Sequence, residues 1–257
     1  MIKIVAVAHD KKRLAFLYQA LLLVNGNLTS ETATIVMISS SGNCKAEDIM
    51  KMNEKNRTDF EFEFFDDTYF DFGGYSAGFE KIDSSVEGCI FINDTISNKH
   101  RSSHLMKLFS EKINKSLNFS MGGSILVGPY GKSEFSFSSG LMDEYVPTYL
   151  FYLNSSAFIN LKNIYSKINI IKNCVDNGFD VDTEFSVYRG FAGLHASQIS
   201  SRFKDRDKMN RKLVTAIVER CISVDAKKDG IIWFCDLGVK NKMRILFQKK
   251  IGILFSR

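Results

Sequence analysis

Two short polar segments in this sequence border strand-like runs and carry residue types that bind phosphate. Residues 71–74 read Asp-Phe-Gly-Gly, and residues 93–95 read Asn-Asp-Thr after an apolar run at 88–92. Adjacent glycines ahead of a helix let the backbone approach a ligand closely and expose amide donors for a phosphate. A carboxylate just past a strand, here Asp94, suits a Mg²⁺ or Mn²⁺ ion that bridges a diphosphate. The competing interpretation is that the glycines only form a turn and that Asn93 and Asp94 cap the next element.

Strand-like and helix-like segments alternate along the first half of the chain. Apolar runs predict strands at residues 2–8, 33–38, 60–65, 88–92 and 124–127. Apolar residues at helical spacing predict helices at residues 11–24, 46–56, 78–84 and 104–115. This alternation predicts an α/β fold whose mainly parallel sheet has helices on both faces. Ligands of such sheets bind beyond the carboxyl ends of the strands, and the polar segments fall there.

The second half is less regular. Its pattern predicts helices at residues 160–173, 185–199 and 210–222 and a strand at 231–235, whereas 148–158 fits either a strand or a helix. No internal repeat and no Pro/Ser/Gly-rich linker divides the chain, so we expect a single domain.

The composition is that of a soluble protein able to bury a core. The chain has 257 residues, of which 45% are hydrophobic and 25% charged. Its five cysteines are scattered without a Cys-x-x-Cys pair, which predicts reduced thiols in a cytoplasmic protein and argues against a disulfide framework or a zinc finger. The N-terminus lacks a signal-peptide pattern, and no apolar run reaches transmembrane length.

Residues 239–257 form a basic and apolar C-terminal tail with six Lys or Arg and no acid. Such a segment suits a peripheral contact with an anionic membrane surface. It could equally pack its apolar side on the domain, and both interpretations stay open. We expect no nucleic-acid partner, because the basic residues are not interleaved with an aromatic stacking platform.

The run DFGGYSAGFEKI, followed by GCIFINDT, resembles bacterial polysaccharide glycosyltransferases of the rhamnan-synthesis F type. In that family an Asn-x-Gly-Arg-Asp-x-Gly segment leads to a helix and then to a strand ending in Asn-Asp-Ser. The first strand, which ends in Ala-His-Asp at residues 8–10, resembles the family's start as well. The likeness covers residues 1–130. The sequence departs from this family at residues 68–70, where Thr-Tyr-Phe replaces Asn-Gly-Arg. A more distant resemblance is to the family-2 glycosyltransferases. The two acids of their Asp-x-Asp motif are replaced here by Asn93 and Thr95.

The resemblance implies a GT-A-like single domain over residues 1–238, with a nucleotide-sugar-binding half at 1–130, an acceptor half at 131–238 and the tail at 239–257. It implies a glycosyltransferase that moves a sugar from a nucleotide-sugar donor to a growing bacterial surface polysaccharide, such as capsule, O-antigen or lipooligosaccharide. The acceptor would be a glycan or a lipid-linked glycan at the inner face of the cell membrane.

The residues expected to bind the nucleotide-sugar donor are His9, Ser39, Asp71, Gly73, Gly74, Asn93, Asp94 and Thr95. A divalent metal, Mg²⁺ or Mn²⁺, would bind through Asp94. Because neutral oxygens bind Mg²⁺ less well than carboxylates do, the charge of the diphosphate could instead be met by Lys99, His100 and Arg101.

An inverting transferase needs a carboxylate to take the proton of the acceptor hydroxyl. The family has a Glu just before a helix in the second half, and Glu184 matches it best, with Asp182 second. The alternative is that Asp182 caps a helix and Glu184 is a first-turn acid. Asp143 and Glu144 are further candidates near the acceptor.

Two other functions remain compatible with the sequence. One is a non-catalytic sugar-nucleotide or glycan-binding domain, a degenerate transferase, which the altered strand-end triplet favours. The other is an unrelated flavodoxin-like or nucleotide-binding α/β protein, for which the first five predicted strands would suffice.

Overall fold

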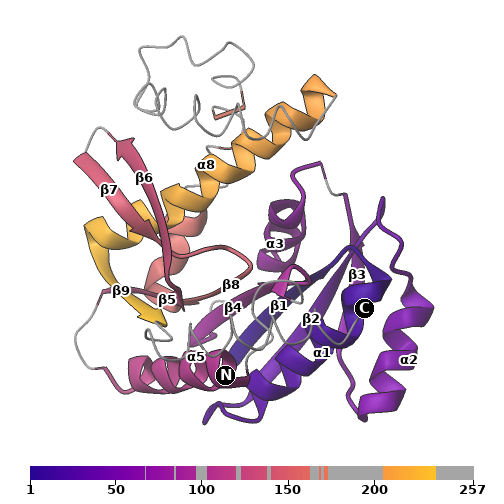
Figure 1. Cartoon of the computed structure of the whole chain (residues 1–257). Helices are drawn as coiled ribbons and strands as arrows, with labels where there is room; N and C mark the ends of the chain where they lie inside the picture. The colour runs from indigo at the N-terminus through magenta and orange to yellow at the C-terminus, as the bar shows by residue number, and fades with distance from the viewer. Residues whose placement is uncertain are drawn as a thin grey trace, which may run out of the picture.

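A mixed seven-stranded sheet forms the centre of the protein, in the order β3-β2-β1-β4-β8-β5-β9 (Figure 1). The computed structural model describes residues 1–66, 68–83, 85–96, 103–119, 123–137, 140–162, 168, 171–172 and 205–235. Four parallel strands make up one side of the sheet: β1 (Ile2–Ala8), β2 (Thr32–Ser39), β3 (Glu61–Phe65) and β4 (Gly88–Asn93). On the other side, β8 (Leu150–Asn154) runs antiparallel between β4 and β5 (Ser124–Pro129), and β9 (Gly230–Cys235) is parallel to β5 at the edge.

Helices cover both faces of the sheet and divide the apolar side chains into two cores. One face carries α1 (Lys11–Asn25), α2 (Ala46–Asn56) and α5 (Ser103–Leu117), and the other carries α3 (Asp71–Phe79) and α8 (Arg206–Asp229). Along β1, Ile4 and Ala6 join the first core while Val5 and Val7 join the second, as the alternation of a strand requires. Because helices lie on both sides, the strand reads as an almost unbroken apolar run.

A separate antiparallel hairpin, β6 (Gly131–Phe137) and β7 (Gly140–Tyr145), follows β5. It stands beside α8 (Figure 1). The chain then turns through residues 146–149 into β8 and a short 3-10 helix, η1 (Ser155–Ala157). The sequence pattern does not predict the hairpin, because residues 131–145 lack a sustained apolar alternation.

Helix α3 differs most from its prediction in the first half of the chain. The predicted helix covered 78–84, but α3 begins at Asp71, so Gly73 and Gly74 lie within its first turns and not in a preceding turn. Glycine is a poor helix former by itself. Packing explains the difference, because added Cβ atoms on Gly74 and Gly78 would lie 2.7 Å from Val7 and 2.3 Å from Val5 of β1.

The predicted fold class is confirmed: the protein is an α/β domain with a mainly parallel sheet and helices on both faces. The ambiguous segment at 148–158 forms β8 and η1, and the helix predicted at 210–222 is the longer α8. The helix predicted at 185–199 and the tail at 239–257 lie outside the described residues. Within the described ranges no helix is long and apolar enough to cross a membrane.

Candidate functional site

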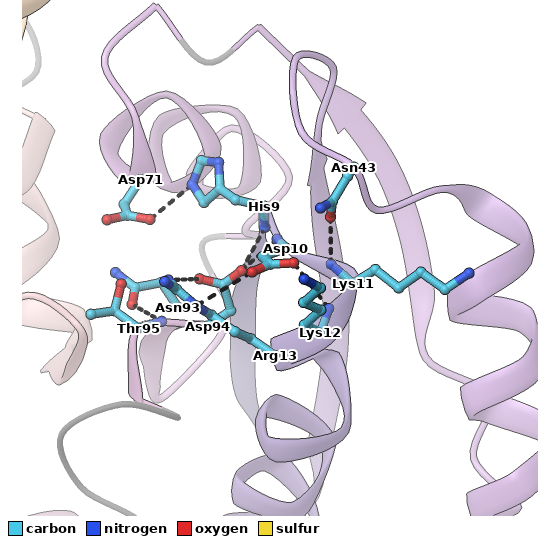
Figure 2. Close-up of polar contacts among 10 residues, drawn as sticks. All are labelled: His9, Asp10, Lys11, Lys12, Arg13, Asn43, Asp71, Asn93, Asp94 and Thr95. Carbon is cyan, nitrogen blue, oxygen red and sulfur yellow. Dashed lines mark hydrogen bonds and ion pairs between the residues drawn. The ribbon is translucent and has the colours of Figure 1, made fainter.

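Five of the residues expected to bind the sugar donor meet at one edge of the sheet (Figure 2). His9 follows β1, Asn93 ends β4, and Asp94 and Thr95 come directly after it. Asp71 reaches the same edge as the first residue of α3. This edge holds the carboxyl ends of the parallel strands, which is the expected position for a ligand of an open α/β sheet.

His9 and Asp71 form a direct side-chain contact, with His9 Nε2 at 2.9 Å from Asp71 Oδ1. Their side chains are 24% and 22% exposed, so the pair borders solvent and is accessible to a ligand. The His9 ring also packs edge-on against Phe65 at the end of β3. The pair combines an imidazole and a carboxylate, which together can both donate hydrogen bonds to a nucleoside and accept them from it.

Asp94 is buried, with 1% exposure, and connects β4 to the start of α1. Its Oδ2 accepts hydrogen bonds from the main-chain N–H groups of His9 and Asp10, each at 2.8 Å. Its own N–H donates to the carbonyl of Val7 at 3.0 Å. Burial raises the pKa of Asp94, while the two N–H donors oppose that shift. We call this set of contacts the Asp94 latch.

The other strand-end residues are also engaged in local structure. The side chain of Asn93 accepts from the N–H of Thr95 at 3.0 Å, and the Asn93 N–H donates to the carbonyl of Tyr149 at 3.1 Å. Ser39, the last residue of β2, is 1% exposed, and its carbonyl accepts from the N–H of Gly42. These residues therefore shape the edge, and Thr95 is the more exposed member of the triplet.

Gly73 and Gly74 bring α3 close to the sheet. The N–H of Gly73 already donates to the carbonyl of Phe70 at 3.1 Å. A Cβ on Gly73 would lie 2.6 Å from the carbonyl oxygen of Asp66, and one on Gly74 would lie 3.0 Å from the ring of Phe65. Gly73 and Gly74 allow close packing of the helix on the sheet, which sets the position of Asp71. Direct contact of these glycines with a ligand stays a prediction.

Phe70 leads into α3 with φ 54° and ψ −134°, a conformation that L-residues rarely adopt. Such backbone strain costs about 1–3 kcal/mol and persists only where the surroundings hold it. On α8, Lys212 places its ammonium 5.2 Å from the centre of the Phe70 ring. The strained residue turns the chain immediately before Asp71, so that the carboxylate of Asp71 meets His9.

The turn at residues 146–149 connects this edge to α8. Thr148 donates from both its N–H and its hydroxyl to Glu219 Oε1, at 2.9 and 3.0 Å. The carbonyl of Thr148 accepts from the hydroxyl of Tyr75 in α3 at 2.7 Å. Because the next residue, Tyr149, accepts from Asn93, one hydrogen-bonded chain runs from α8 to the end of β4.

The donor set around Asp94 does not fit the expected divalent cation. Mg²⁺ and Mn²⁺ need several accessible oxygen ligands, preferably carboxylates. Asp94 is buried with Oδ2 engaged by two N–H groups, and the Asn93 side-chain oxygen accepts from Thr95. Among the residues that the structure describes, no group of three His, Cys, Asp or Glu side chains is arranged to hold a metal ion.

Several candidates lie outside the described residues, namely Lys99, His100, Arg101, Asp182 and Glu184. Asp143 and Glu144 fall in β7, where Glu144 is exposed.

Sequence reasoning missed Arg13, Asn43 and Glu219. Arg13 lies three residues after the helix cap Asp10, a spacing that predicts their contact. No local signal connects Asn43 with the N–H of Lys11, which it caps at 2.7 Å, or Glu219 with Thr148.

No family model matches the sequence, and no curated protein matches it either. Among solved structures, 4-diphosphocytidyl-2C-methyl-D-erythritol synthase from Anaerococcus prevotii DSM 20548 is similar at 12% sequence identity and a TM-score of 0.38. The match covers 74% of this chain and 84% of that chain. At this degree of similarity, the case for a function rests on the site itself.

Proposed function

We propose that the chain is a glycosyltransferase that uses a nucleotide-sugar donor and extends a bacterial surface polysaccharide. The observation that carries the proposal is the convergence of His9, Asp71 and the Asn93–Thr95 triplet at the carboxyl ends of β1 and β4. This convergence agrees with the resemblance of the sequence to rhamnan-synthesis F-type glycosyltransferases, which places donor-binding residues at the same positions.

The His9–Asp71 pair is the nucleoside-facing part of the site. The Asp71 carboxylate has accepting capacity beyond its contact with His9, and it is partly exposed. Ribose hydroxyls and base N–H groups are donors that match it. Thr95, two residues after β4 and partly exposed, is the proposed contact for the diphosphate or the transferred sugar.

The reaction needs a base, and Glu184 is the proposed residue, with Asp182 as the second choice. The acceptor hydroxyl attacks the anomeric carbon of the donor and forms the new glycosidic bond. Its proton passes to the carboxylate, while the bond between the anomeric carbon and the diphosphate oxygen breaks. The nucleoside diphosphate leaves with the bonding electron pair. A divalent cation at the diphosphate stays a prediction that the donor set around Asp94 does not support.

The acceptor half of the proposal concerns residues 131–238 and the tail. The β6–β7 hairpin and α8 border the strand-end edge through the turn at 146–149. A basic, apolar tail at 239–257 would hold the protein at the inner face of the cell membrane, where a lipid-linked glycan acceptor is anchored.

A panel of nucleotide sugars tests the proposal. Binding is measured by calorimetry, and turnover by release of the nucleoside diphosphate, with the full-length protein in the presence and absence of Mn²⁺. We expect at least one nucleotide sugar to bind and to be hydrolysed slowly without an acceptor. The proposal fails if no member of the panel binds or is cleaved under either condition.

The second candidate is a sugar-nucleotide-binding domain without catalysis. The engagement of Asp94 in main-chain hydrogen bonds favours it, because the triplet keeps no accessible acid. It predicts binding of a nucleotide sugar with no hydrolysis and no transfer to any lipid-linked glycan. The same panel therefore separates the two functions.

A further inference from the structure

The Asp94 latch removes the carboxylate of the strand-end triplet from the ligand-facing surface. A diphosphate carries negative charge that must be met when it leaves water, by a metal ion or by cationic side chains. Because the donor set at Asp94 does not fit a metal ion, a cationic side chain at this edge is needed to balance the charge of the diphosphate.

Arg13 is the described cation that pairs with the strand-end triplet. It lies in the first turn of α1, with its NH1 atom 3.6 Å from Asp94 Oδ1 and its Nε atom 3.6 Å from Asp10 Oδ2 (Figure 2). Both separations exceed the length of a protein hydrogen bond, about 2.7–3.2 Å. The guanidinium is therefore oriented by two carboxylates while it keeps N–H groups for a further partner, and its side chain is 36% exposed.

The main-chain amides at the start of α1 do not offer an alternative cradle for an anion. The N–H of Lys11 donates to Asn43 Oδ1 at 2.7 Å, and the N–H of Lys12 donates to Asp10 Oδ1 at 3.0 Å. The side chain of Lys11 points to α2, where it pairs with Asp48 at 2.6 Å. These amides are therefore engaged, and among the described side chains Arg13 is a cation that pairs with Asp94, the residue following β4.

We propose, on the premise of the glycosyltransferase function above, that the site binds the diphosphate of its sugar donor without a divalent cation on Asp94, and that Arg13 supplies the positive charge. A guanidinium can form two parallel N–H···O bonds to phosphate oxygens, which an ammonium cannot. Asp94 and Asp10 act on Arg13 as positioning residues. The ligand class is a nucleoside diphosphate or its sugar ester.

Titration calorimetry of the full-length protein with UDP, GDP and inorganic pyrophosphate tests this proposal, once in EDTA and once in Mn²⁺. The variants are Arg13→Gln, Arg13→Lys and the matched control Lys12→Gln, which removes the same charge from the neighbouring position. In EDTA we expect wild-type affinity to stay within about twofold of its value in Mn²⁺, and Arg13→Gln to lower it by at least about tenfold through loss of a charge-assisted hydrogen bond. Arg13→Lys should recover part of that loss, and Lys12→Gln should change affinity by less than about twofold, as for a screened surface charge.

The outcomes separate this inference from the proposed function. Nucleotide binding that disappears in EDTA and returns with Mn²⁺ overturns the inference and leaves the glycosyltransferase proposal intact. Equal effects of Arg13→Gln and Lys12→Gln overturn the assignment of Arg13. If neither nucleotide nor pyrophosphate binds in EDTA or in Mn²⁺, the inference fails, and the panel of nucleotide sugars decides the proposed function separately. Arg13-dependent binding of pyrophosphate alone supports an anion site and removes UDP and GDP as its ligands. Thermal unfolding of each variant shows whether it is folded. If Arg13→Gln does not fold, Arg13→Lys still tests the role of the guanidinium.

Discussion

His9 Nε2 lies 2.9 Å from Asp71 Oδ1, although the two residues are 62 positions apart in the chain. The contact joins the end of β1 to the start of α3. Asp94 fixes the main chain at His9, and close packing of Gly74 against Val7 and Phe65 fixes α3. The geometry of the pair is therefore set by the sheet and not by flexible loops, which is what a preorganised binding site needs.

Replacing Asp71 with Asn should weaken nucleotide binding without unfolding the protein. The change removes the charge that faces His9 but keeps the size of the side chain. We expect affinity for the bound nucleotide to fall by about tenfold, in line with one charge-assisted hydrogen bond, and stability to change by less than about 1 kcal/mol because the pair is partly exposed. Calorimetry and urea denaturation measure the two effects.

The control for Asp71→Asn is Glu63→Gln. Glu63 is an exposed acid that pairs with Lys81 at 3.2 Å, so its loss tests the general effect of removing one negative charge. Equal affinities for the two variants would remove Asp71 from the nucleotide-binding site.

Gly78→Ala should destabilise the protein, because its new Cβ would lie 2.3 Å from Val5 Cγ1 in the central strand. Overpacking of a core costs about 1–3 kcal/mol, while the better helix propensity of Ala returns about 1 kcal/mol. We expect the free energy of unfolding to fall, by up to about 2 kcal/mol, in urea denaturation. Gly26→Ala, where the nearest atom is the Leu22 carbonyl oxygen at 3.2 Å, is the matched control and should stay near the wild-type value.

The stability of the Asp94→Asn variant, relative to that of wild type, should increase as the pH rises. Burial raises the pKa of folded Asp94 above its ordinary value of 3.8, so folding favours the protonated form. The stability that this group contributes is complete below the unfolded pKa and is lost as the pH rises through the folded pKa. Asn does not titrate, and its amide oxygen can still accept from His9 and Asp10.

The measured quantity is the free energy of unfolding of Asp94→Asn minus that of wild type, from about pH 3.5 to pH 7, across and above the ordinary Asp pKa. The difference should increase with pH. Acids with lowered pKa values, such as Asp48 beside Lys11, change stability in the opposite direction but cancel in this difference. A difference that decreases with pH would show that the carboxylate of Asp94 is stabilised in its charged form.

Glu219→Ala should destabilise the turn at 146–149. The N–H and the hydroxyl of Thr148 would both lose their acceptor, and Thr148 is buried. A buried unsatisfied donor costs about 1–3 kcal/mol, which urea denaturation would detect. Glu111→Ala, at an exposed position of α5, should change stability by less than about 0.5 kcal/mol.

Glu184→Gln should abolish sugar transfer while nucleotide-sugar binding stays within about twofold of wild type, because a general base acts on the acceptor and not on the donor. Asp182→Asn is the companion variant. Transfer assays with a lipid-linked glycan, together with calorimetry, measure both effects. Full turnover of Glu184→Gln would assign the base elsewhere.

Local patterns were sufficient to predict most elements of the first half. β1 and β4 are apolar runs, and α1 has apolar residues at helical spacing, so hydrophobic periodicity identified them. The predicted start of α3 was wrong, because the intrinsic conformational preference of adjacent glycines indicates a turn. In the folded protein the same glycines allow a helix to lie against β1, a tertiary effect that no local pattern contains.

The candidate site was predictable in position but not in detail. Fold reasoning placed His9, Asp71 and the triplet at one edge, since parallel strands end together. Asp94 could be interpreted as a metal ligand or as a capping residue from sequence alone. Its partners, His9 and Asp10, are 85 and 84 positions away, and only the register of β1 and β4 brings them within reach.

The Asp94 latch also bears on how freely the site can change by mutation. Its carboxylate bonds to main-chain N–H groups, which every residue except proline provides at positions 9 and 10. The end of β1 should therefore keep its path when the imidazole of His9 is exchanged for another side chain. On the proposed function, related proteins could carry different side chains there and accept different nucleosides without a change in the sheet beneath them.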